Sequence, residues 1–175
     1  MERRAVTVGV VRELLVMRHG KSDWSTDDED FERPLAKRGR QDARRMAEWL
    51  VEHDLEPDQI LTSTATRARM TVQPVIDAFD IADDRVHARD SLYLANAWTW
   101  LGALEEAPQG RVLFCGHNPG LDDLVEYLSA DTLPLTFDGK LMTTAAIARF
   151  GFDEEWSGIG RGSGELLALV RPRQL

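Results

Sequence analysis

Two apolar runs in this chain have the length and composition of buried β-strands, and each ends abruptly beside a histidine. Residues 13–17 (ELLVM) lead directly to Arg18 and His19, and residues 111–115 (RVLFC) lead, after one glycine, to His117. In α/β sheets, ligands bind beyond the carboxyl ends of the strands. The pattern therefore predicts that both histidines lie at one edge of a sheet, where a ligand can reach them.

Strand-like and helix-like segments alternate along the rest of the chain. Further strands are predicted at residues 59–62, 86–88, 144–150 and 165–170, and amphipathic helices at residues 36–53, 72–79, 95–107 and 121–128. Pro74 lies inside the second helical pattern, and we expect it to kink or delay that helix. The alternation predicts a three-layer α/β/α sandwich with a mostly parallel central sheet.

The length and composition fit one soluble domain. The chain has 175 residues, of which 43% are hydrophobic and 29% charged, as is typical of globular proteins. We expect residues 13–175 to form this domain and residues 1–12 to form an N-terminal arm or edge segment. No apolar run is long enough to cross a bilayer, and the N-terminus lacks the pattern of a signal peptide. These features predict a cytoplasmic protein without membrane contact.

The net charge and the cysteine content exclude several function classes. A net charge of −9 argues against nucleic acid as a partner, because nucleic-acid binding needs a basic surface. Cys115 is the only cysteine, which excludes an internal disulfide and a cysteine-built metal site. An acidic protein that handles an anionic substrate must concentrate its positive charge in one pocket. The arginines near the two histidines therefore matter more than the total charge.

The residues near the strand ends suit phosphoryl transfer. This reaction needs a nucleophile and cations that neutralise the transferring group. His19 is a candidate nucleophile, Arg18 is a guanidinium beside it, and Gly20 lets the backbone approach a phosphate closely. Arg67 follows the predicted strand at residues 59–62, near a probable helix start, and His117 offers a further donor. Each residue alone has an ordinary interpretation, as a polar loop residue or a surface arginine.

The order of these segments resembles the histidine phosphatase superfamily, which includes phosphoglycerate mutases and acid phosphatases. The resemblance rests on residues 15–20 (LVMRHG), on Ser63-x-x-x-Arg67-Ala68-x-x-Thr71 and on residues 116–119 (GHNP). Arg33-Pro34-Leu35 with Gly39, and Gly164-Glu165-Leu166 ending near Pro172, resemble its small bacterial branch, the phosphohistidine phosphatases of the SixA type. The resemblance covers roughly residues 13–172 and implies a phosphoglycerate mutase-like fold.

The resemblance also implies a role for each matching residue. It implies that His19 is the residue phosphorylated, that Arg18 and Arg67 are phosphate ligands, that His117 is a charged stabiliser, that Gly20 and Ser63 support the pocket and that Asn118 is a further neighbour. It implies neither a metal nor a cofactor. The expected partner is a phosphorylated protein, such as a phosphorelay or phosphotransfer protein, or a small phosphorylated substrate.

One departure from the family pattern concerns the acid that protonates the leaving group. Larger members carry a glutamate after the second motif, whereas residues 90–96 (DSLYLAN) contain none. An alkoxide leaving group without an acid loses about 10²–10⁴-fold in rate. A phosphohistidine needs less help, because its imidazole leaves as a neutral group. Asp23 is a candidate substitute, although a solvated loop carboxylate is the simpler interpretation.

Gly20-Lys21-Ser22 resembles the end of a nucleotide-binding loop, but Leu15 stands where that motif requires glycine, which argues against a kinase or NTPase. Two alternatives remain. The first, from another class, is a binding module that recognises phosphate with little turnover. The second is a small-molecule phosphomonoesterase of the same family. The preferred prediction is a phosphatase that removes phosphate from a phosphohistidine protein through an intermediate on His19.

Overall fold

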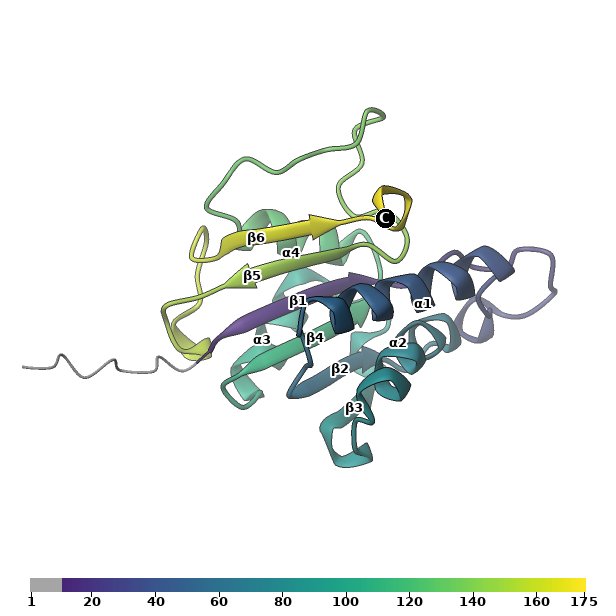
Figure 1. Ribbon diagram of the computed structural model, residues 1–175, viewed down its shortest axis with the longest axis horizontal. Helices are drawn as coiled ribbons and strands as arrows, with labels where there is room; N and C mark the ends of the chain where they lie inside the picture. Colours follow the sequence, from purple (N-terminus) through teal and green to yellow (C-terminus); the bar gives the residue numbers. More distant parts are fainter. Residues whose placement is uncertain (1–10) are drawn as a thin grey trace, which may run out of the picture.

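The structure is a computed structural model, and it describes residues 11–175. Its centre is a sheet of six strands in the order β3-β2-β4-β1-β5-β6. The strands are β1 (Glu13–Arg18), β2 (Gln59–Ser63), β3 (Val86–Arg89), β4 (Arg111–Gly116), β5 (Ile147–Gly151) and β6 (Glu165–Val170). Strands β1 to β4 pair in parallel, and β5 and β6 extend the sheet in antiparallel pairings (Figure 1). The predicted α/β fold with a mostly parallel central sheet is confirmed, and the antiparallel β5 and β6 make the sheet a mixed one.

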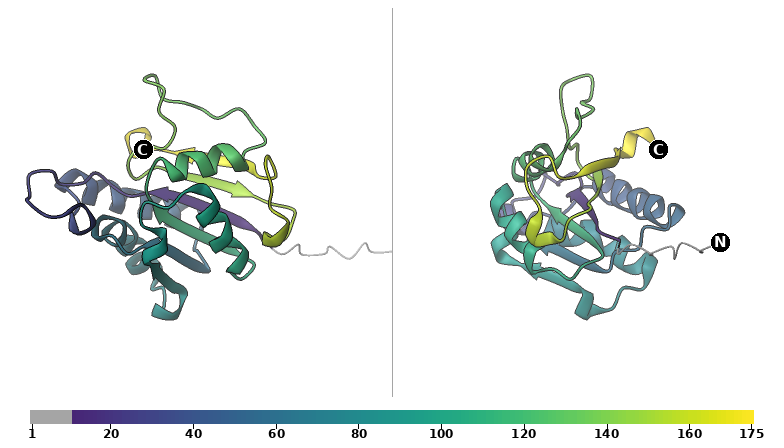
Figure 2. Two further views of the ribbon diagram at one scale, coloured as in Figure 1. Left: turned by 180° about the vertical axis from the view of Figure 1, so that it is seen from behind. Right: turned by 90° about the vertical axis from the view of Figure 1, so that its left-hand side faces the viewer.

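Four α-helices cover the two faces of this sheet: α1 (Lys37–Glu52), α2 (Thr66–Phe79), α3 (Ala97–Glu106) and α4 (Gly120–Leu128). Helices α1 and α2 lie on one face, and α3 and α4 lie on the other (Figures 1 and 2). The side chains of β1 alternate between the two cores that result: Leu14 and Val16 pack toward α3 and α4, and Leu15 and Met17 toward α1 and α2. Both faces of the central strands are therefore buried, as expected for a three-layer α/β/α sandwich.

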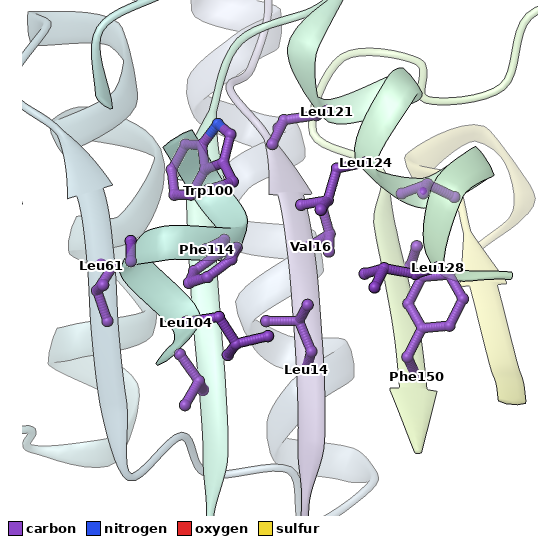
Figure 3. Close-up of a cluster of buried hydrophobic side chains, with 14 of the residues drawn as sticks. Leu14, Val16, Leu61, Trp100, Leu104, Phe114, Leu121, Leu124, Leu128 and Phe150 are labelled. Carbon is purple, nitrogen blue, oxygen red and sulfur yellow. The ribbon is translucent and has the colours of Figure 1, made fainter. Parts of the chain in front are cut away.

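The core under α3 and α4 holds the larger aromatic side chains. Trp100 of α3 is fully buried against Phe114 of β4, with ring centroids 4.6 Å apart (Figure 3). Gly116 at the end of β4 lies under this tryptophan, since a Cβ built on Gly116 would be 2.4 Å from its ring. The indole of Trp100 thus packs directly against the strand end that leads to His117. A larger residue at position 116 would displace either the indole or this strand end.

Two sequence predictions need correction. The strand expected at residues 144–150 is shorter, because β5 begins only at Ile147, after a turn in which Ala145 adopts a positive φ of 62°. Helix α2 is not delayed by Pro74, since it begins at Thr66 and continues through the proline to Phe79. Buried Val72 and Val75 hold this part of the helix against the sheet. This packing outweighs the loss of one backbone hydrogen bond.

The strand register brings the carboxyl ends of β1, β2 and β4 to one edge. Arg18 pairs with Gly116, and Thr62 pairs with Cys115 one residue earlier in β4. The residues that follow these strands therefore meet at the same place. Of the predicted N-terminal segment 1–12, residues 1–10 lie outside the described residues. Between residues 11 and 175, no helix is long and apolar enough to span a membrane.

Candidate active site

His19 is fixed immediately after β1. Its backbone N–H donates to the carbonyl of Gly116, 3.0 Å away, and its ring Nδ1 lies 2.7 Å from the carbonyl oxygen of Gly20. Because a carbonyl only accepts, Nδ1 carries the proton and Nε2 keeps its lone pair. Among residues 11–175, none forms a hydrogen bond with that Nε2. Burial, together with the charges of Arg67 and Arg18, lowers the pKa of His19 to about 4. The ring is therefore neutral at pH 7, with an unprotonated Nε2.

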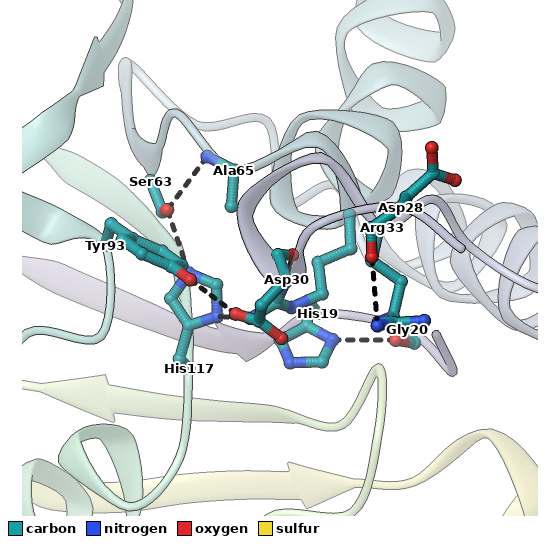
Figure 4. Close-up of polar contacts among 10 residues, drawn as sticks. His19, Gly20, Asp28, Asp30, Arg33, Ser63, Ala65, Tyr93 and His117 are labelled. Carbon is teal, nitrogen blue, oxygen red and sulfur yellow. Dashed lines mark hydrogen bonds and ion pairs between the residues drawn. The ribbon is translucent and has the colours of Figure 1, made fainter. Parts of the chain in front are cut away.

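His117 faces His19 from the end of β4, with the two ring centroids 5.2 Å apart (Figure 4). Its Nδ1 accepts from Nη2 of Arg67 at 3.3 Å, so its Nε2 carries the proton and donates to Oγ of Ser63 at 2.8 Å. Burial, His19 and Arg67 lower the pKa of His117 to about 3. His117 is therefore neutral in this structure, whereas the superfamily resemblance implied a charged stabiliser.

Two arginines flank His19. Arg67, in the first turn of α2, is 4% exposed and donates from Nη1 to the carbonyl of Asp30 at 2.5 Å. Arg18 donates from Nη1 to the carbonyl of Met142 at 2.9 Å, and its buried Nε has no protein partner. A pocket of about 180 Å³ lies between them and includes His19 and Asp30 in its wall. We refer to it as the phosphate pocket.

Asp30 and Tyr93 belong to this site although no motif of the sequence assigned either residue a role. A carboxylate oxygen of Asp30 lies 3.1 Å from Nη2 of Arg67 and accepts a short hydrogen bond from the hydroxyl of Tyr93 (Figure 4). The bond from Tyr93, together with Arg67, lowers the pKa of Asp30, whereas burial and the Asp30 carboxylate raise the pKa of Tyr93. The Tyr93 ring also packs edge-on against His117, with centroids 5.4 Å apart. Asp30 is therefore an ionised carboxylate in the phosphate pocket.

Comparison with known proteins supports a function for this arrangement. The family model described as histidine phosphatase superfamily (branch 1) matches residues 14–107, which is more than half of the chain. The phosphohistidine phosphatase SixA of Escherichia coli is 30% identical over 151 residues, covering 83% of this chain and 89% of the relative. The chain belongs to the histidine phosphatase superfamily.

Solved structures agree with this membership. A structure of the protein histidine phosphatase SixA complexed with tungstate superposes with a TM-score of 0.76 at 25% identity, covering 93% of this chain and 98% of that one. A phosphoserine phosphatase of Entamoeba histolytica shares the fold alone, with a TM-score of 0.65 at 14% identity over 94% of this chain and 99% of that one. Membership of the histidine phosphatase superfamily supports a phosphatase that acts on a phosphorylated substrate.

The remaining residues that the superfamily resemblance named lie at different places. Ser63 contacts His117 and accepts from the N–H of Ala65 at 3.1 Å, so it positions that ring (Figure 4). The N–H of Gly20 donates to the hydroxyl of Thr71 at 3.0 Å, which joins the loop after β1 to α2. Asn118 uses its amide to bind the Met142 carbonyl at 3.1 Å and is not part of the pocket wall. Asn118 therefore supports the loop before β5.

Asp23, the candidate for acid chemistry, lies outside the site. The Asp23 carboxylate accepts from the N–H and hydroxyl of Ser25, at 2.9 and 2.6 Å, and does not line the phosphate pocket. It is a loop carboxylate, which was the simpler interpretation. Within residues 11–175, no group of three or more His, Cys, Asp or Glu side chains is arranged to hold a metal ion.

Proposed function

We propose that this histidine phosphatase removes phosphate from a phosphohistidine protein and that His19 carries the phosphoryl group between the two half-reactions. The observation that carries the proposal is the bond between Nδ1 of His19 and the carbonyl of Gly20, 2.7 Å long. This bond keeps the proton on Nδ1 and leaves Nε2 free for attack. The same bond stabilises the imidazolium that forms when Nε2 becomes phosphorylated, because the carbonyl accepts from its N–H.

The first half-reaction exchanges one phosphorus–nitrogen bond for another. Nε2 of His19 forms a bond to phosphorus as the bond to the substrate imidazole breaks. The substrate ring leaves as neutral imidazole when its other nitrogen is already protonated. Arg18 and Arg67 supply positive charge to the oxygens of the transferring group. In the second half-reaction, water attacks phosphorus, and His19 leaves as the neutral ring from which it started.

The state of Asp30 supports a phosphoramidate substrate over a phosphate ester. Asp30 is a carboxylate at the pocket, but the hydrogen bond from Tyr93 and the contact with Arg67 lower its pKa. An ionised carboxylate has no proton to give to an alkoxide, so an ester leaving group would depart unaided. An imidazole leaving group does not need this proton. A second candidate, a small-molecule phosphomonoesterase, requires another acid.

The proposal is tested with two phosphopeptides of matched sequence, one with phosphohistidine and one with phosphoserine. We expect the wild type to hydrolyse the phosphohistidine peptide with a kcat/KM at least about 10²-fold higher. The variant His19→Ala loses at least about 10³-fold in kcat. His53→Ala is the matched control, because His53 is exposed at the end of α1 and is expected to leave the rate unchanged.

Two other outcomes would redirect the assignment. Equal and slow phosphate release by wild type and His19→Ala from every substrate, p-nitrophenyl phosphate included, would leave only a phosphate-binding module. Faster hydrolysis of the phosphoserine peptide would favour the phosphomonoesterase. An acid-labile, base-stable phosphoenzyme that is lost in His19→Ala would support the proposed intermediate.

A further inference from the structure

A second and larger pocket opens beside the phosphate pocket. Its volume is about 530 Å³, and its wall comes from the start of α1, the loop that precedes β5 and the turn that follows β6. Strand β6 runs in the same direction as β1, so both end at this edge of the sheet (Figure 1). The two pockets share Arg18, Lys21 and Thr144 in their walls. A single ligand can therefore extend from one pocket into the other.

The wall of this larger pocket is strongly basic in an acidic protein. Its cations are Arg18, Lys21, Arg38, Lys140, Arg171 and Arg173. Only two carboxylates, Asp42 and Asp138, accompany these six cations, whereas the chain as a whole has a net charge of −9. A concave surface with this excess of one sign concentrates its field in the pocket and attracts anions.

Most of this positive charge is not neutralised by the protein. Lys140 pairs with Asp138 at 2.8 Å, and Arg38 approaches Asp42 only to 4.0 Å. Within residues 11–175, Arg18, Lys21, Arg171 and Arg173 form no ion pair. The excess is therefore available to a bound anion.

Arg171 shows that the charge is built into the fold. It is only 6% exposed, and its guanidinium is held by backbone carbonyls: Nη2 donates to Pro134 at 2.6 Å and to Leu141 at 2.9 Å. Carbonyls satisfy its hydrogen bonds, but they do not cancel its charge. Burial of a cation without a counter-ion costs free energy, and an anion in the pocket offsets this cost. Arg171 therefore fixes the loop before β5 and makes the pocket wall positive.

We infer that this pocket binds a second anionic group of the same substrate molecule, while the phosphate to be removed occupies the phosphate pocket. We call it the second-anion pocket. The inference rests on the proposed function only in that both pockets serve one substrate. The anionic group is a carboxylate cluster beside a phosphohistidine in a protein, or a further phosphate in a small molecule. These two sources share the same chemistry, and the experiment below separates them.

The first experiment compares two competitive inhibitors of p-nitrophenyl phosphate hydrolysis. Orthophosphate fills only the phosphate pocket, whereas tripolyphosphate also reaches the second-anion pocket. We expect tripolyphosphate to bind more tightly, and the double variant Lys140→Ala plus Arg173→Ala to reduce this preference about 5-fold or more. Both side chains are exposed, so the variant is expected to fold. Arg44→Ala is the control, because Arg44 is an exposed arginine of α1 that lines neither of these two pockets.

The second experiment identifies the source of the anionic group. Phosphohistidine peptides with glutamates on both sides of the histidine are compared with peptides in which glutamine replaces each glutamate. A preference for the glutamate peptide that the double variant reduces indicates a protein substrate. A preference for tripolyphosphate without any peptide preference indicates a small molecule.

Either of two results would overturn the inference: equal inhibition constants for the two inhibitors in the wild type, or a preference that the double variant leaves intact. Both results are distinct from failure of the proposed function. If neither phosphopeptide nor p-nitrophenyl phosphate is hydrolysed, calorimetric titration with the same two anions still measures the preference. The salt dependence of that titration provides an internal check, since a larger number of ion pairs gives a steeper loss of affinity with salt.

Discussion

The two sides of the phosphate pocket carry similar cations in opposite electrostatic settings. On the side of α2, both terminal nitrogens of Arg67 contact Asp30, whose carboxylate is also bound by Tyr93. On the other side, Arg18 donates to the neutral carbonyl of Met142, forms no ion pair within residues 11–175 although the Asp122 carboxylate acts on it at longer range, and lines the second-anion pocket. The protein thus neutralises one side itself and leaves the other side for its ligand. If the proposed function holds, we expect the body of the substrate to lie over Arg18 and away from Asp30.

The two arginines provide the strongest test of this comparison. Arg67→Ala removes a cation and leaves the Asp30 carboxylate unpaired at the pocket, whereas Arg18→Ala removes a cation that no carboxylate contacts. We expect tungstate to bind about 100-fold more weakly to Arg67→Ala and about 10-fold more weakly to Arg18→Ala. Isothermal titration calorimetry measures both constants, with Arg44→Ala as the control. Unchanged affinity in Arg67→Ala would remove this residue from the pocket, and the reverse order would contradict the asymmetry.

Asp30 itself gives a smaller effect of opposite sign. Asn replaces the carboxylate with a neutral group of the same shape, so an incoming anion no longer competes with Asp30 for Arg67. We expect Asp30→Asn to bind tungstate about 5-fold more tightly. Asp27→Asn is the matched control. Asp27 is exposed, belongs to the same run of four acidic residues (27–30) as Asp30, and does not line the phosphate pocket. Weaker binding by Asp30→Asn would show that Asp30 positions Arg67 more than it competes with the ligand.

The sequence predicted the residues that a strand end fixes. His19, Ser63 and His117 lie at or just after the carboxyl ends of parallel strands, and the register of such strands brings these ends together. Asp30 and Tyr93 escaped prediction because they lie in irregular segments between elements, where no periodicity indicates which way a side chain points. The second-anion pocket escaped for the same reason, since its wall joins four segments distant in sequence: the end of β1 with the loop after it, the start of α1, the loop before β5 and the turn after β6.

Gly39 belongs to a motif that only the packing of the structure explains. The sequence showed it as part of a family pattern, with no physical cause. In the structure, a Cβ on Gly39 would lie 2.3 Å from the carbonyl oxygen of Lys21, and a Cβ on Gly20 would lie 2.8 Å from the carbonyl oxygen of Gly39. The start of α1 therefore packs directly on the backbone of the loop after β1. Both glycines allow this contact, which holds His19 at the mouth of the pocket.

The smallest expected effect is that of pH on the protonation of His19, and it tests both sides of the phosphate pocket together. Arg18 and Arg67 flank His19 and, with burial, lower its pKa from 6.5 to about 4, whereas Asp30 acts in the opposite direction. A histidine with its ordinary pKa would lose about 30-fold of its neutral form between pH 8 and pH 5, but His19 should lose less than about 2-fold. Titration of the ring by NMR, assigned with His19→Gln, measures this directly, and a midpoint near 6.5 would contradict the burial of the site.

The lowered pKa of His19 also makes the stability of the folded protein depend on pH. The unfolded chain takes up this proton below about pH 6.5 and the native protein only below about pH 4, so stability should fall as pH decreases from 6.5 to 4.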